Sequence, residues 1–494
     1  MRYDAIIIGA GAEGLAAATL LAQAGLRVLV VERSERAGGR SVTREFHPGF
    51  RASPFADEMA PIPAELYWAL DLARRGAVFA PLRYSLALWP DRHHLLALHE
   101  AAETSAGRFL AQAQALRAAV LGRAAHETVK AKRRTIFDPG SADGTPWPGD
   151  EWATLSLHEA IDARIASPDA LAHIAALALC GRAADPYLPG SALHLLLAGA
   201  TGGRLAGGLA LLADALVATA RAAGVEFSFG LEATDIHRRG CRIVGIDLAD
   251  GSRIATRSVI STLDLKRTFL TFFPWNALPK AVVRRVSNFR MAGATARVLF
   301  ALDRLPHLPV PQAAGADLHV SPDLDRMADA WQAWRAGIVV EHLPVTLRIV
   351  SDGDPTLAPP GAAVVTATLG AVPFRLFDGG WTYEKREFLR QRAIAAAEQV
   401  LPGFAAHVIA SEVVAPPDIE DTLGATDGDL LGGEIAGDQM LSAGLWPEHA
   451  LPRTPIAGLY LAGSHLSVGA IATCAAGASA ARALIVDREQ GRIE

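Results

Sequence analysis

The sequence predicts an α/β fold built on a Rossmann-like dinucleotide-binding unit at its amino terminus. Three observations predict it: an apolar run over residues 4–8, the glycine turn Gly9–Gly14 that follows at once, and a run of helix formers over 15–24. A second apolar run over 27–31 ends in Glu32. This order of strand, glycine turn, helix, strand and acid is the context in which a GxGxxG sequence binds a dinucleotide.

Each part of the glycine turn has a physical role. Gly9 allows the tight turn, Gly11 lacks a Cβ so that the backbone can approach a pyrophosphate, and Gly14 lets the helix pack on the sheet. Ala12 and Glu13 stand at the expected helix N-terminus, where unpaired N–H groups and the helix dipole attract phosphate. All five residues are therefore predicted to hold the dinucleotide.

The stretch that begins at Glu32 carries a second glycine pair. The Glu32 carboxylate is expected to accept hydrogen bonds from ribose hydroxyls. Gly38 and Gly39 offer another close backbone approach, and Arg33 and Arg40 add cations beside it. A simple NAD domain does not need this pair. The stretch resembles the one that lines the FAD pyrophosphate and ribityl chain in two-dinucleotide-binding-domain flavoproteins, which implies FAD as the cofactor.

The carboxyl-terminal part is expected to supply further FAD contacts. A short buried strand ends at Gly463 and Ser464, and Ser464 would donate a hydrogen bond to the ribityl chain. A helix of small residues is expected over 470–484. Its start would direct N–H groups at the flavin N1/O2 edge and stabilise the negative charge of reduced flavin. The residues at that start are Ala470, Ile471 and Ala472.

Several segments, in the same order, resemble the phytoene-desaturase-like flavoproteins of the amine oxidase and carotenoid desaturase superfamily. The resemblance implies an FAD-binding domain interleaved with an α+β substrate domain. It also implies that Ala233 contacts the cofactor. The resemblance covers nearly the whole chain. The matching segments are 43–51, 221–226, 248–251, 259–264, 265–270, 354–361 and 378–381.

Two segments depart from the family pattern. Residues 428–434 carry no histidine where family members have a GHIFHGE-like sequence. In the glycine-rich stretch before the last helix, Ala470, Ile471 and Cys474 stand where the family has glycines. These departures predict either a reshaped substrate pocket or reduced flavin chemistry.

The fold is expected to interleave its domains along the chain. Strand patterns are expected over 295–302, 345–350 and 363–369, and turns at Gly240 and Gly251. The expected segments are an FAD-binding part over 1–85, a mostly helical substrate-domain part over 86–195, an FAD-binding part over 196–272, a substrate-domain part over 273–418 and a closing FAD-binding part over 419–494.

Composition bounds the partners. The 494 residues are 51% hydrophobic with a net charge of −5, and no long basic tract is present, so nucleic acid is not an expected partner. We expect neither a signal peptide nor a membrane-spanning helix, and hence a cytoplasmic protein, with peripheral contact to the inner face of the membrane as the alternative. Residues 193–199 are interpreted as buried helix, with a membrane-contacting surface as the alternative.

No metal site is expected, because His93, His94 and His99 lack acidic or cysteine partners at ligand spacing and are assigned to a solvated loop.

The favoured function is an FAD-dependent oxidoreductase that dehydrogenates or isomerises an apolar isoprenoid or lipid-like substrate. Flavin performs the redox chemistry itself, so few catalytic side chains are expected. The candidates are His465, which directly follows Ser464 and would reach the isoalloxazine, and Lys266, which would face the flavin. The alternatives are a packing role for His465 and a surface position for Lys266. A flavin amine or amino-acid oxidase, which needs an aromatic cage or an arginine clamp, is the second hypothesis. A degenerate subunit that acts through a second copy or a paralogous partner is the third.

Overall fold

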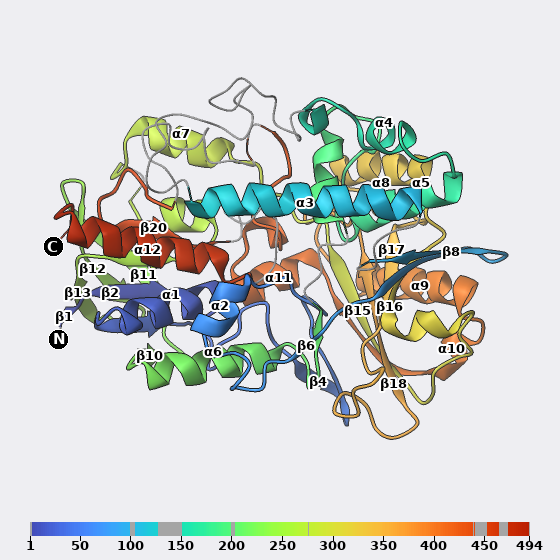
Figure 1. Cartoon of the computed structure of the whole chain (residues 1–494), viewed down its shortest axis with the longest axis horizontal. Coiled ribbons are helices and arrows are strands. Elements are labelled where there is room, and N and C mark those ends of the chain that lie inside the picture. Colours follow the sequence, from blue (N-terminus) through green and yellow to red (C-terminus); the bar gives the residue numbers. More distant parts are fainter. Residues whose placement is uncertain are drawn as a thin grey trace.

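The computed structural model describes residues 2–98, 104–126, 151–198, 203–274, 276–437, 439, 452–463 and 473–493. Two halves lie side by side in Figure 1, and both chain termini belong to the half that carries the parallel sheet. Some predicted features lie outside the described residues. They are the polar break over 138–150, His99, Ser464, His465 and the residues Ala470, Ile471 and Ala472.

The first half is organised around a five-stranded parallel sheet. All neighbouring pairs in it run in the same direction. A parallel sheet is covered on both faces, which explains why its strands are continuous apolar runs. The two predicted amino-terminal strands are confirmed. In spatial order the strands are β10 (Glu226–Ser228), β3 (Val28–Val31), β2 (Ala5–Ile8), β14 (Val259–Ser261) and β20 (Leu459–Leu461).

Three helices cover this sheet: α1 (Ala12–Gln23), α6 (Ala210–Ala222) and α12 (Ala475–Glu489). Helix α1 packs against both of the others. A Cβ on Gly477 would lie 1.9 Å from the Glu13 carbonyl oxygen, so the close approach of α12 to α1 requires glycine there. The predicted start of the last helix is wrong. Cys474 adopts a left-handed conformation (φ 61°), and α12 begins only after it.

Smaller sheets complete the fold. The two predicted turns are confirmed, since Gly240 and Gly251 have φ of 63° and 82° between antiparallel strands. The four-stranded sheet contains, in order, β1 (Arg2–Tyr3), β13 (Arg253–Thr256), β12 (Arg242–Leu248) and β11 (Ala233–Arg239). The paired short strands are β4 (Arg44–His47) with β5 (Phe50–Ala52), and β6 (Phe79–Ala80) with β9 (Arg204–Leu205). Of these, the pair β4–β5 packs against the second half.

The second half is built on a seven-stranded sheet whose neighbours are antiparallel except for one parallel pair, β16 and β7. The strands predicted near 295–302, 345–350 and 363–369 are confirmed. In spatial order the sheet contains β19 (Val408–Val414), β15 (Ala296–Leu302), β18 (Ala363–Leu369), β17 (Val345–Ile349), β16 (Ala316–Val320), β7 (Tyr84–Leu88) and β8 (His93–Ala97).

The expected solvated loop at His93 and His94 is wrong, because both residues lie on β8 and His94 Nδ1 is 2.9 Å from His173 Nδ1. The apolar run near 193–199 is buried helix as far as the structure describes it, since every residue from Ser191 to Leu197 is buried. Among the described residues, no helix is long and apolar enough to cross a membrane.

The remaining helices and short helical turns are divided between the two halves. They are α2 (Ala64–Ala69), α3 (Ser105–His126), η1 (Glu151–Ala153), α4 (Leu157–Asp162), α5 (Pro168–Leu179), η2 (Ser191–Leu197), η3 (Arg267–Thr271), α7 (Lys280–Asn288), η4 (Pro311–Gly315), α8 (Leu324–Arg335), α9 (Tyr383–Val400), α10 (Phe404–His407), α11 (Pro416–Leu423) and η5 (Thr426–Gly428). Of these, α2, η3 and α7 lie in the first half (Figure 1).

The two faces of the seven-stranded sheet differ in polarity. Successive side chains of a strand point to opposite faces. On β17, Leu347 joins the apolar core, whereas Arg348 points to the other face. The strand register places Arg348 opposite Asp317 on one side and opposite Thr366 on the other. The sheet thus turns a row of polar side chains away from its own core.

Candidate active site

A groove of about 1050 Å³ runs along the carboxyl ends of the parallel strands. Ile8 and Val31, the last residues of β2 and β3, line it together with Glu32. Ligands of open α/β sheets bind at this edge. The position agrees with the site predicted from the glycine turn.

The three glycines of the turn play three different roles. Gly9 has φ of +100°, and a Cβ there would lie 2.2 Å from Thr262 Oγ1. A Cβ on Gly14 would lie 2.1 Å from the Gly9 carbonyl oxygen, so Gly14 permits the contact of α1 with the turn. Nothing lies within 4 Å of a Cβ on Gly11. Gly11 therefore borders open space, the cradle that a pyrophosphate needs.

The second glycine pair lies directly over the first turn. The Gly38 N–H donates to the Ala10 carbonyl (3.0 Å), and a Cβ on Gly39 would lie 3.4 Å from the Gly11 Cα. Both Gly38 and Gly39 have positive φ, at 142° and 56°. The two glycine stretches thus form a single wall of the groove, although more than twenty residues separate Gly14 from Gly39 in the sequence.

The Glu32 carboxylate lies at the end of β3, as predicted. One oxygen accepts the Ala10 N–H (2.7 Å) and the other accepts the Ser34 N–H (2.9 Å). Each carboxylate oxygen has a second lone pair, so Glu32 retains the capacity to accept ribose hydroxyls. Its two backbone hydrogen bonds also hold the carboxylate in place before any ligand binds.

The predicted cations brace the groove. Arg33 Nη2 donates to the Asp421 carbonyl (2.9 Å), at the end of α11. Arg40 donates to the Leu430 carbonyl, and burial lowers the pKa of its guanidinium. Both arginines line the groove and tie its glycine wall to the wall formed by residues 412–432.

Glu13 borders the groove, but its carboxylate serves α12. It accepts the Gly477 N–H (2.9 Å) and the Thr473 hydroxyl (3.2 Å), and burial raises its pKa. The Glu13 carboxylate therefore fixes the amino-terminal end of α12 against α1. Ala233, at the start of β11, lines the groove as predicted.

A second cavity, of about 180 Å³, adjoins the groove and shares Phe55 and Leu430 with it. Its floor is the polar face of the seven-stranded sheet. Its other lining comes from the segment after β5, from the region around α5 and from α3. The charged lining residues are Asp57, Glu58, Arg117, Arg182, Arg297, Asp317 and Arg348.

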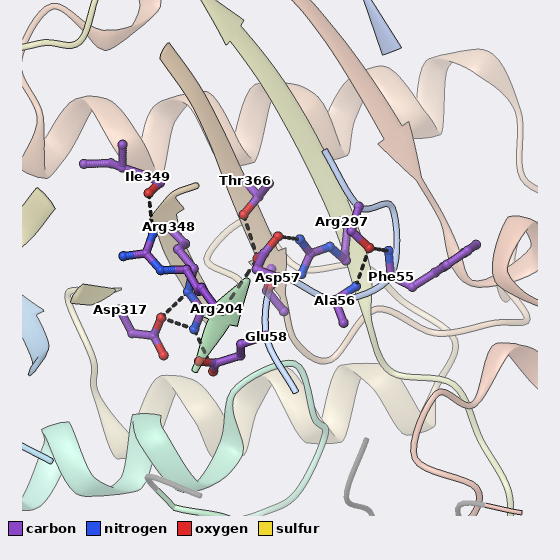
Figure 2. A network of polar contacts seen from close by, with 12 residues as sticks. Phe55, Ala56, Asp57, Glu58, Arg204, Arg297, Asp317, Arg348, Ile349 and Thr366 are labelled. Atoms are coloured by element: carbon purple, nitrogen blue, oxygen red, sulfur yellow. Dashed lines mark hydrogen bonds and ion pairs between the residues drawn. The ribbon is translucent and has the colours of Figure 1, made fainter. Parts of the chain in front are cut away.

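Figure 2 shows the ion-pair network on this sheet face. Asp57 accepts from Arg297 Nη2 (2.6 Å) and from the Thr366 hydroxyl (2.7 Å), with the side chains of the pair 3% and 4% exposed. Arg348 is bound to Asp317 and donates to Glu58 Oε1 (2.9 Å). Burial opposes the charge on Asp57, yet the adjacent arginines Arg297 and Arg348 outweigh it and hold its pKa below the usual value.

Glu58 differs from the other carboxylates of the network. Its Oε2 is buried and has no hydrogen-bond partner. Burial raises the pKa of Glu58 to about 7, and the Arg348 charge opposes that rise without cancelling it. Glu58 can therefore gain or lose a proton near neutral pH, which is what a general acid or base requires.

Comparison with known proteins places the chain in a family. The family model described as flavin containing amine oxidoreductase matches residues 14–485. The chain belongs to this family. Its cofactor is FAD, which the groove fits through Gly11, the Gly38–Gly39 wall and Glu32.

The individual relatives of this chain are diverse. The chain is 28% identical over 545 residues to pyridine nucleotide-disulfide oxidoreductase domain-containing protein 2 of Mus musculus, covering 98% of this chain and 94% of that protein. A phytoene desaturase (lycopene-forming) of Pseudescherichia vulneris is 24% identical over 288 residues, 57% of this chain and 55% of that one. A putrescine oxidase variant has the same fold at a TM-score of 0.62, with 14% identity and 99% of both chains covered.

The structure does not bring every predicted residue to the groove. Lys266 directly precedes η3 and is not among the groove-lining residues, whereas its neighbours Asp264 and Arg267 are. Gly463 follows the buried Ala462, which lines the groove. Ser464, His465 and residues 470–472 lie outside the described residues, so their predicted contacts with the cofactor stay predictions, although the last helix itself begins only at Ala475.

The charged cavity was not predicted from the sequence. Its residues come from separated segments and form no spacing motif. One signal was present: Arg297 and Arg348 each interrupt an otherwise apolar strand. A charge in such a strand indicates a second, polar environment on the other face of the sheet.

Proposed function

We propose that this FAD-dependent oxidoreductase oxidises a small polar molecule held in the 180 Å³ cavity. The observation that carries the proposal is the junction of cavity and groove at Phe55 and Leu430, which puts a bound molecule beside the cofactor. FAD, held by Gly11, the Gly38–Gly39 wall and Glu32, would supply the redox chemistry: acceptance of a hydride from a substrate C–H bond and transfer of the electrons to an acceptor such as oxygen or a quinone.

The protein's own part is to position the substrate and to take its proton. Oxidation of an amine or alcohol carbon also releases a proton from nitrogen or oxygen. Glu58 is the side chain we assign to that proton, since its Oε2 has no partner and the residue lines the cavity. Arg348 and Asp317 hold the other end of Glu58 in place through the network.

The cavity lining bears on the choice of substrate. Seven charged side chains line it beside apolar ones such as Phe55, Leu177 and Leu430. The charged groups favour a substrate that carries a polar group, as in an amine or amino-acid oxidase, over the largely apolar one expected from the sequence. An arginine clamp, which that second hypothesis required, has candidates here in Arg117 and Arg182.

The test is anaerobic reduction of the holoenzyme by candidate substrates, measured as the loss of visible flavin absorbance. The panel contains small amines, amino acids, hydroxy acids and phytoene. We expect a polar substrate to bleach the flavin, with a rate that rises with pH through about 7 as Glu58 loses its proton. Glu58→Gln retains the shape and should lower the rate and remove that pH dependence.

Two results would contradict this assignment. Reduction of the flavin by phytoene, and by none of the polar compounds, would contradict the polar substrate and support the isoprenoid hypothesis. An unchanged pH profile in Glu58→Gln, at equal FAD content, would remove Glu58 from the reaction.

A further inference from the structure

The 180 Å³ cavity lies inside the protein, and we call it the enclosed cavity. Of the described residues that line it, each is buried or at most partly buried, and none is exposed to solvent. It meets the groove at Phe55 and Leu430, and FAD takes up that groove in the holoenzyme. A substrate of the holoenzyme therefore needs a route to the enclosed cavity that does not pass through the cofactor site.

A third cavity, of about 110 Å³, adjoins the enclosed cavity, and we call it the vestibule. The two share Cys180, Gly181 and Thr346 in their lining, whereas no described residue lines both the vestibule and the FAD groove. The vestibule lies beyond the carboxyl end of β16, between α5, α8 and α9 (Figure 1). Groove, enclosed cavity and vestibule thus follow one another in series.

The outer end of the vestibule opens at the surface. Four residues that line it are exposed: Asp323, Arg326, Glu341 and His342. At this rim Arg392 Nη1 donates to Glu341 Oε1 (2.5 Å). Groups of both charge signs therefore surround the opening. A polar molecule can form hydrogen bonds with these groups as it leaves water, which an apolar molecule cannot.

The inner end of the vestibule carries a ring nitrogen without a partner. His319 is 1% exposed, its Nδ1 lies 2.9 Å from Thr346 Oγ1, and its Nε2 has no hydrogen-bond partner. His319 stands two residues beyond Asp317 on β16, so the polar face of the sheet continues into the vestibule. Burial lowers the pKa of His319 to about 4, which keeps the ring neutral at neutral pH and leaves Nε2 able to bond a passing molecule.

The neck between the vestibule and the enclosed cavity depends on a glycine. Gly181 has φ of +67°, and a Cβ there would lie 3.0 Å from Cγ2 of Thr368, which lines the enclosed cavity. A larger residue at position 181 would reach across this space and narrow the neck. Cys180, beside it, retains partial exposure although burial raises the pKa of its thiol. Exposed surface on an interior cysteine indicates that solvent reaches the neck.

We infer that the vestibule is the entrance through which a small polar substrate reaches the enclosed cavity. The molecule enters beside α8 and α9, passes His319, and crosses the neck at Cys180 and Gly181. The inference deepens the proposed function and rests on it for the role of the enclosed cavity as the substrate site. Polar groups along the whole route give a polar molecule the easier passage.

Thiol labelling of the holoenzyme tests this route. The probe is methyl methanethiosulfonate, whose sulfur is attacked by a cysteine thiolate to form a methyl disulfide with release of methanesulfinate, and intact mass spectrometry follows the reaction. Cys241→Ser removes an exposed thiol, and Cys474 is fully buried, so Cys180 reports on the neck. In a second protein, Thr368→Cys combined with Cys180→Ser and Cys241→Ser places a thiol in the enclosed cavity.

Two substitutions narrow the vestibule without changing the enclosed cavity. Ala395 is an exposed residue of α9 and Ala176 a buried residue of α5, and both line the vestibule but not the enclosed cavity. Ala395→Trp and Ala176→Leu should each slow the labelling of both thiols at least tenfold at equal FAD content. Gln391→Trp is the matched control, because Gln391 is exposed one turn earlier on α9 and does not line the vestibule. It should leave both rates within twofold.

The outcomes separate the two proposals. Unchanged labelling rates in both narrowed variants, or no labelling of either thiol, would overturn the entrance. Slower labelling of Cys180 alone would overturn it too, since the vestibule would then end at the neck. Slower labelling of both thiols, in an enzyme whose flavin no polar compound reduces, would support the entrance and contradict the proposed function.

Discussion

The roles assigned to two glycines of the turn predict opposite consequences for the same substitution. In Gly11→Ala the added methyl group meets no protein atom within 4 Å, and the backbone there is extended (φ −73°, ψ 173°), which alanine adopts freely. In Gly14→Ala the methyl carbon would stand 2.1 Å from the Gly9 carbonyl oxygen. The first change should affect the cofactor, and the second should affect the fold.

The magnitudes follow from these distances. Gly11 is the N-cap of α1, where alanine in place of glycine costs about 1 kcal/mol, and the lower entropy of the unfolded alanine chain returns part of it. In Gly11→Ala the free energy of unfolding of the apoprotein should therefore change by less than about 1 kcal/mol. The methyl group takes space that the pyrophosphate needs, so the FAD dissociation constant should rise at least tenfold, or about 1.4 kcal/mol. Gly14→Ala must displace α1 from the turn, an overpacking that costs about 1–3 kcal/mol or more.

The assay pairs an FAD titration with thermal unfolding of the apoprotein. Gly25→Ala is the control, because Gly25 has φ of +84° and no neighbour within 4 Å of a Cβ. It should lose about 1–2 kcal/mol of stability from backbone strain and bind FAD normally. Gly11→Ala with wild-type FAD affinity, or with a stability loss as large as that of Gly14→Ala, would refute the placement of the pyrophosphate over Gly11.

Three further substitutions test the other contacts. Asp57→Asn should lower the free energy of unfolding, measured with denaturant, by about 3–5 kcal/mol, since it leaves Arg297 buried without its counter-ion. The double change Asp57→Leu with Arg297→Leu should lower it less, and a larger loss for the double change would contradict this account of the pair. Glu32→Ala should weaken FAD binding, measured by fluorescence titration, by roughly 1.5–3 kcal/mol, because the charged hydrogen bonds to the ribose are lost. An unchanged affinity would show that the ribose does not bind at Glu32. Glu13→Ala should raise amide hydrogen exchange at the start of α12, because the Gly477 N–H loses its acceptor; exchange that stays at the wild-type rate there would show that Glu13 does not hold the helix.

The FAD half could be predicted closely because its signals are local. A turn, a helix start and a strand end all lie within the first forty residues, and each is specified by the side chains present there. The structure then adds what local sequence does not contain. Gly39 lies over Gly11, and the Glu13 carboxylate turns towards α12 rather than towards the groove.

The second half, built on the seven-stranded sheet, could be predicted only as strands and helices. Its cavity depends on the register between strands that are far apart in the sequence. Asp317 faces Arg348 because β16 and β17 pair in that register, and Asp57 reaches Arg297 from a segment about 240 positions earlier. Neither pairing leaves a pattern along the chain, so the sequence favoured an apolar substrate where the folded chain places charges.

Cys474 is the one altered position of the glycine stretch that lies among the described residues. The loss of glycines in this stretch predicts, as one outcome, a damaged site and a subunit without catalysis. Cys474 has a left-handed backbone (φ 61°), a conformation in which glycine is favoured, and its side chain is fully buried in the core of the FAD half. Cysteine therefore adopts there, at the cost of some strain, a backbone conformation that glycine adopts freely. This conformation, the FAD groove and a carboxyl group with a pKa near neutral beside that groove favour the enzyme over the degenerate subunit.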